Sequence, residues 1–116
     1  MMRNIFIFMI ICFFWAACST AYAHPPSDII ITFDSKTKIL NAVIMHNVSN
    51  PENHFIKKVD VALNDREIIE HKISRQDNNI NQTVAYLIPD AKTGDKISVE
   101  AHCSISGKTK REIKVP

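Results

Sequence analysis

Residues 55–74 read FIKKVDVALNDREIIEHKIS and are the most informative part of the chain for its fold. From residue 58 to residue 61 polar and apolar side chains alternate, and Leu63 continues the apolar face, which is typical of a β-strand with one buried face. Asn64-Asp65 is a tight-turn dipeptide, and residues 66–74 form a second run with strand-like composition. The stretch therefore predicts a β-hairpin that lays one face on a hydrophobic core.

Similar short runs, rich in β-branched and aromatic residues, lie on both sides of this hairpin. Breaking residues such as Pro89 and Gly107 separate them. The expected strands are 28–34, 39–46, 55–63, 66–74, 83–88, 96–104 and 108–115. Because no segment has a helical period, the sequence predicts an all-β fold, an immunoglobulin-like antiparallel β-sandwich of about seven strands.

The N-terminus has the features of an export signal. Arg3 precedes an apolar run over residues 5–17, and Ala21-Tyr22-Ala23 offers small residues at a cleavage site. The apolar run is too short for a comfortable membrane span. We therefore predict a signal peptide at 1–23, a domain at 24–116 and a free periplasmic protein, with no membrane span. Lipid anchoring through Cys18 is the less favoured alternative.

Composition limits the remaining possibilities. The predicted mature chain has about 93 residues, enough for a single small domain. Its acidic and basic residues nearly balance, and no basic stripe with interleaved aromatics is present in the sequence, so nucleic acid is not an expected partner. Only Cys103 of the three cysteines remains. That thiol is a core residue, a metal ligand or half of an intermolecular disulfide.

Two histidines flank a turn-rich connection between predicted strands. His46 ends one strand and His54 precedes the next, so the loop would carry both to one rim of the sandwich. Cys103 lies near the end of a later strand, on the inward face. Two imidazoles and a thiolate suit a transition metal. His71 and His102 are expected to be ordinary solvent-facing side chains.

The segments around these residues resemble the iron-binding domain of the superoxide reductase family, the neelaredoxins and desulfoferrodoxins. His46 and the Glu-Asn-His-Phe-Ile segment at 52–56 are similar to the family's His-Pro and Glu-His-His-Ile segments. The Cys-Ser-Ile-Ser-Gly segment at 103–107 is similar to its Cys-Asn-x-His-Gly motif. His24, followed by two prolines, is similar to its early Lys-His-x-Pro motif.

This resemblance implies a ferrous ion held by His24, His46 and His54, with Cys103 as the axial thiolate. It also implies superoxide as the substrate, reduced to peroxide, and a protein that donates the electron. The chain departs from the family at two points: Ser106 stands where the fourth histidine belongs, and the Glu-Lys pair before the first histidine is missing. Whether reductase activity is retained is therefore left open.

Two other functions stay open. Cleavage after Ala23 would give His24 a free amine, and with His46, His54 or His102 it would form a nitrogen set suited to copper. In a third hypothesis the chain is a non-enzymatic scaffold, because Thr93-Gly94-Asp95 and the strand that follows are similar to a segment of the small sandwich subunits of thiosulfate-oxidising complexes. An exposed apolar patch on one sheet would favour that hypothesis.

Overall fold

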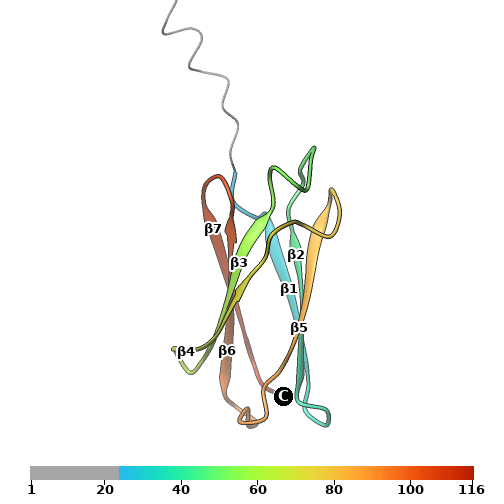
Figure 1. Cartoon of the computed structure of the whole chain (residues 1–116). Coiled ribbons are helices and arrows are strands. Elements are labelled where there is room, and N and C mark those ends of the chain that lie inside the picture. Colours follow the sequence, from blue (N-terminus) through green and yellow to red (C-terminus); the bar gives the residue numbers. More distant parts are fainter. Residues whose placement is uncertain (1–23) are drawn as a thin grey trace, which may run out of the picture.

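The computed structural model describes residues 24–116, so the predicted signal peptide at 1–23 and Cys18 lie outside the described residues. Seven strands are present: β1 (Asp28–Asp34), β2 (Ile39–Met45), β3 (Ile56–Leu63), β4 (Arg66–Lys72), β5 (Asn81–Leu87), β6 (Lys96–Cys103) and β7 (Lys108–Lys114). They form two antiparallel sheets, of order β1-β2-β5 and β4-β3-β6-β7 (Figure 1). The predicted all-β sandwich is confirmed, and the predicted strand bounds differ by one or two residues.

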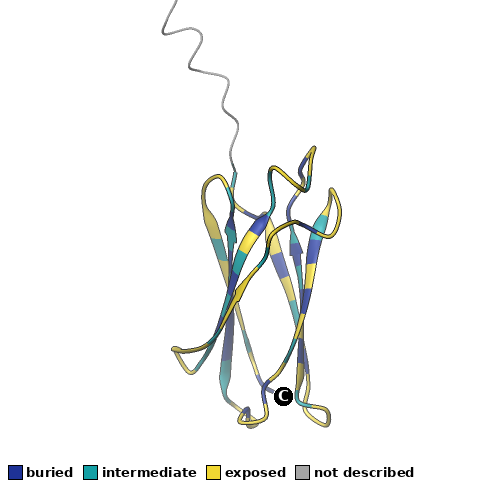
Figure 2. Cartoon of the chain, viewed as in Figure 1, coloured by how far each residue is buried: buried dark blue, intermediate teal, exposed yellow. Residues whose placement is uncertain are grey.

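The hairpin that the sequence singled out is β3–β4. Asn64 and Asp65 both adopt positive φ, of 50° and 68°, which is the backbone of a two-residue hairpin turn. Val59 and Val61 are fully buried, whereas Lys58 and Asp60 face outward. This alternation lays one face of β3 on the core (Figure 2).

The core lies between the sheets. It is built from the inward residues of the central strands, where Leu40, Ile44, Ile97 and Val99 have no exposed surface. Cys103 continues the inward row of β6 and is 3% exposed, as its alternation with Val99 predicted. Within residues 24–116 no helix is long and apolar enough to cross a membrane.

One end of the sandwich collects most of the unusual residues. The register pairs Met45 with Asn81 and Ile56 with Cys103, so β2 and β6 finish at the end where β3 and β5 begin. The N-terminal segment also enters there, because Asp28 pairs with Met45. This end, at the top of Figure 1, brings together segments that are far apart in the sequence.

Candidate metal centre

Three of the four predicted ligands meet at this end of the sandwich. The ring centroid of His24 lies 5.0 Å from that of His46 and 5.0 Å from that of His54, and the centroids of His46 and His54 are 4.7 Å apart. Each ring offers a nitrogen, and the three nitrogens lie within 4.8 Å of one another. Nitrogens bound to one ion at about 2.0–2.1 Å lie at most about 4.2 Å apart, so an ion would draw the three rings closer together.

The loop between β2 and β3 reverses the chain so that His54 faces His46. Asn50 stabilises this turn: its carbonyl oxygen accepts hydrogen bonds from the backbone N–H groups of Asn53 (3.2 Å) and His54 (3.0 Å). Its side-chain Oδ1 also accepts from the N–H of Glu52 at 3.0 Å. This turn chemistry is what asparagine supplies in loops. The predicted placement of both histidines on one rim is thereby confirmed.

His24 reaches the cluster because the segment before β1 is fastened at several points. The Ser27 N–H donates to the carbonyl of Met45 at 2.8 Å, and the Thr109 hydroxyl donates to the carbonyl of Pro26. A Cβ built on Gly107 would lie 2.9 Å from the Cβ of Pro25, so this segment packs directly on the β6–β7 turn. The segment is therefore held by the ends of β2 and β7.

His46 is the most enclosed member of the cluster. Its side chain has no exposed surface, and its Nε2 is buried with no hydrogen-bond partner among the described residues. The other ring nitrogen, Nδ1, lies 2.8 Å from Oε1 of Gln76, which is also fully buried. A buried polar atom without a partner lowers the free energy of unfolding. A ligand that bound to this Nε2 would offset that cost.

No pattern in the sequence pointed to Gln76. The segment 75–81 is polar and rich in asparagine, and such a segment is expected to be solvated. In the structure it folds over the end of β2, with the His46 and Val48 N–H groups donating to the carbonyls of Ile80 (2.9 Å) and Asn79 (2.8 Å). A glutamine in an asparagine-rich loop belongs to no periodic pattern. Its burial is therefore visible only once the loop is seen to pack against the end of β2.

Cys103 joins the cluster through His54. Its Sγ lies 3.1 Å from Nε2 of His54 and 3.5 Å from the N–H of Ile105. The group of nitrogens within 4.8 Å does not include this sulfur, so Cys103 borders the three histidines on one side. The strand end is closed by the Ser104 N–H, which donates to the carbonyl of Phe55 at 2.8 Å.

Burial and the neighbouring imidazoles of His46 and His24 lower the pKa of His54. As the pH falls, His54 is protonated in the unfolded chain near its usual pKa of about 6.5, whereas in the folded protein it is protonated only at a lower pH. Protons therefore favour the unfolded state as the pH falls below about 6.5, until the folded pKa is passed. From this residue alone we expect the free energy of unfolding of the metal-free protein to fall, by at most about 1.4 kcal/mol per pH unit.

Urea unfolding at pH 7.5, 6.5 and 5.5 measures this slope. A His54→Asn variant should be less sensitive to acid than the wild type, whereas His71→Asn, at an exposed position on β4, should keep the wild-type sensitivity. Equal slopes for wild type and His54→Asn would contradict the expectation.

The other two histidines lie outside this cluster. The Nε2 atom of His102 lies 3.0 Å from Asp60 and 3.1 Å from Glu100. Because successive strand residues alternate, His102 faces away from the side that Cys103 faces. It is therefore not the copper partner for His24 that the sequence allowed. His71 is exposed, and its Nδ1 lies 2.8 Å from the Tyr86 hydroxyl of the other sheet.

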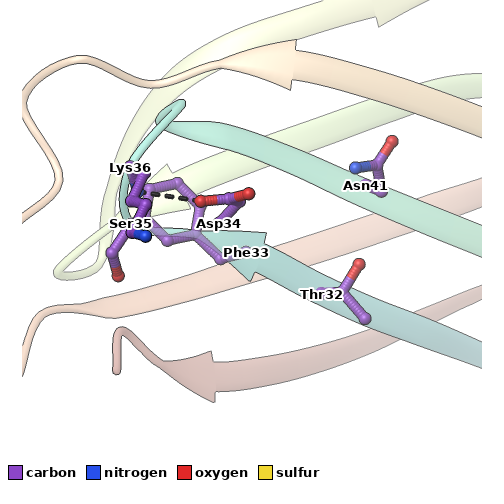
Figure 3. Close-up of a pocket in the computed structure, with 6 residues that line it drawn as sticks. All are labelled: Thr32, Phe33, Asp34, Ser35, Lys36 and Asn41. Carbon is purple, nitrogen blue, oxygen red and sulfur yellow. Dashed lines mark hydrogen bonds between the residues drawn. The ribbon is translucent and has the colours of Figure 1, made fainter.

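A shallow hollow at the β1–β2 hairpin is unrelated to the cluster. Phe33, Lys36 and Asn41 are among the residues that line it (Figure 3). There the Oδ1 of Asp34 accepts hydrogen bonds from the N–H groups of Lys36 (2.8 Å) and Thr37 (3.3 Å), which is an ordinary turn. The hairpin lies at the opposite end of β2 from His46, so this hollow contributes nothing to the centre.

Comparisons with protein-family models, with curated proteins and with solved structures found no match to this chain.

Proposed function

We propose that this protein binds one transition-metal ion through His24, His46 and His54. The observation that carries the proposal is the state of His46: its buried Nε2 has no hydrogen-bond partner among the residues that the structure describes, and its ring is one of three convergent imidazoles. Imidazole nitrogen is a preferred ligand of zinc, copper, iron and nickel. A bound ion would satisfy the unpartnered atom.

Ferrous iron, with Cys103 as a fourth ligand, is the first choice of metal, as the superoxide reductase resemblance implies. The Sγ of Cys103 lies 3.1 Å from Nε2 of His54, a hydrogen-bond contact that keeps the thiol beside the cluster. The sulfur is outside the group of nitrogens that lie within 4.8 Å of one another, so it would have to move toward His24 and His46 to bind the same ion.

Superoxide is the proposed substrate if the iron centre is active. Ser106, which replaces the family's fourth histidine, is exposed on the β6–β7 turn, so the centre would keep an incomplete imidazole set. Lys58 does not replace the missing positive charge, because its ammonium pairs with Asp60 at 3.4 Å on the outer face of β3. We therefore propose metal binding as the function, with reduction of superoxide, supplied by an electron-donor protein, as an activity to be assayed.

Copper is the second choice of metal, and the cluster of three nitrogens favours it. A terminal amine on His24 would chelate copper together with Nδ1 of the same residue, since Nε2 points away from the backbone. In the structure Nδ1 of His24 lies 3.1 Å from the carbonyl of Pro25, to which it donates. Chelation would require that exposed hydrogen bond to break, at a cost of about 1 kcal/mol.

Anaerobic addition of ferrous iron to protein that begins at His24 tests the proposal. We expect one iron per chain and, after oxidation, a visible thiolate-to-iron charge-transfer band that Cys103→Ser removes. Iron retained without a band would exclude Cys103 as a ligand. Copper retained in place of iron would select the second choice, and retention of neither metal would contradict metal binding.

The non-enzymatic scaffold is the remaining proposal, and one observation favours it. The outer face of the β1-β2-β5 sheet exposes Ile30, Ile39 and Leu87. In these three strands, charged side chains occur only at Asp28 and Asp34, the two ends of β1. Such a face suits contact with another protein. Failure to retain either metal in the titration above would leave this proposal as the one to pursue.

A further inference from the structure

Gln76 makes an unusually complete set of contacts for a loop residue. Its side-chain Nε2 donates to the carbonyl of His46 at 2.8 Å and to that of Asn78 at 2.9 Å. Its Oε1 lies 2.8 Å from Nδ1 of His46. Its backbone N–H donates to the carbonyl of Pro51 at 3.1 Å. Every polar group of this buried side chain therefore has a partner.

These contacts fix the orientation of the amide. Two carbonyl oxygens can only accept hydrogen bonds, so the group that faces them must be the amide NH₂ of Gln76. Its oxygen then faces the ring of His46 and can only accept. Turning the amide over would place its oxygen against two carbonyl oxygens in a buried site, with no donor for any of them.

The amide orientation in turn fixes the tautomer of His46. Because Oε1 of Gln76 only accepts, Nδ1 of His46 must carry the proton. In the neutral ring the lone pair is then on Nε2, the atom that is buried without a partner. Metal-bound histidines are oriented in the same manner, by a hydrogen bond from the ring nitrogen that does not bind the ion.

We propose that Gln76 is a positioning residue that locks His46 into the Nδ1–H tautomer and thereby presents the Nε2 lone pair to a metal ion before the ion arrives. The tautomer assignment depends only on the metal-free structure, whereas its consequence for metal binding rests on the proposed function. A neutral amide also orients the ring without adding a negative charge beside the centre. Gln76 is thus part of the site although it does not contact the ion.

Long-range ¹H–¹⁵N NMR of the metal-free protein tests the lock directly. We expect His46 to show a protonated Nδ1 and an unprotonated Nε2. In Gln76→Met, which has a similar shape but no acceptor for Nδ1, we expect the Nε2–H tautomer to appear. A protonated Nε2 on His46 in the wild type would overturn the lock, whatever the variant does.

Metal titration of the same proteins tests the consequence. We expect Gln76→Met to weaken metal binding by about 10- to 100-fold, as the loss of other ligand-orienting contacts does. Unchanged affinity alongside an altered tautomer would overturn the positioning role. A wild-type protein that shows the expected tautomer and retains no metal would instead contradict the proposed function, and the lock itself would stand. If Gln76→Met fails to fold, the wild-type spectrum still decides the tautomer.

Discussion

His46→Leu is expected to lower metal affinity by more than about 100-fold. Loss of a contact that merely orients a ligand costs about 10- to 100-fold, and this substitution removes a ligand itself. For the wild type, metal at 1,000 times its dissociation constant should add about 4.1 kcal/mol to the free energy of unfolding. That corresponds to more than about 15 °C in the melting midpoint of a domain of this size. The variant should lose this metal-dependent rise.

The same substitution should leave the metal-free fold largely intact. It removes a buried Nε2 that has no partner, and burial of such an atom costs about 1–3 kcal/mol. It also leaves Oε1 of Gln76 without its donor, at a similar cost. We expect the free energy of unfolding of the metal-free protein to change by less than about 2 kcal/mol. His46 would then be a residue kept for the site and not for stability.

Calorimetry with and without metal measures both effects. His71→Leu is the control, because His71 is exposed on β4, outside the cluster. The control should keep the wild-type affinity and the metal-dependent rise. Wild-type affinity in His46→Leu would contradict the assignment of His46 as a ligand.

Gly107→Ala is expected to have the second large effect, by moving His24 out of the site. A Cβ at residue 107 would lie 2.9 Å from the Cβ of Pro25 and 3.1 Å from its backbone N and Cα atoms. Backbone atoms cannot swing aside as a flexible side chain does, so the segment before β1 must shift. We expect metal affinity to fall by more than about tenfold, which corresponds to about 1.4 kcal/mol of binding free energy.

Gly94→Ala separates this displacement from backbone strain. Gly94 and Gly107 have nearly equal positive φ angles, of 90° and 87°, but a Cβ at Gly94 meets nothing within 4 Å. Both variants should therefore lose about 1–2 kcal/mol of stability, or roughly 5–10 °C in the melting midpoint, from strain. Only Gly107→Ala should also weaken metal binding. Equal metal affinities in the two variants would show that the Pro25 contact does not position His24.

Much of the fold follows from local sequence patterns. The alternation around Val59 and Val61 predicts which face of β3 is buried, and a period of two residues is a property of the strand itself. Asn64-Asp65 predicts the hairpin turn for a similar reason, because both residues tolerate positive φ. The assignment of seven strands required no knowledge of their neighbours in space.

The candidate site was predicted only in part. His46 and His54 flank one connection, so the sequence could place both on one rim. Cys103 could be added from its inward position near a strand end, and His24 was added by resemblance to a family. The structure places His24 in the cluster and Cys103 beside it. Gln76 was missed because nothing in a polar loop distinguishes a buried glutamine from a solvated one.

Local sequence patterns were enough to predict the all-β class, the buried face of β3 and the inward direction of Cys103 on β6. These features depend on contacts between residues close in the chain and on strand alternation. Three features became visible only in the tertiary structure: His24 packs beside His46, Gln76 is buried, and one buried imidazole nitrogen has no hydrogen-bond partner within residues 24–116. Those features arise where the N-terminal segment and three connections meet at one end of the sandwich, and no local pattern encodes such a meeting.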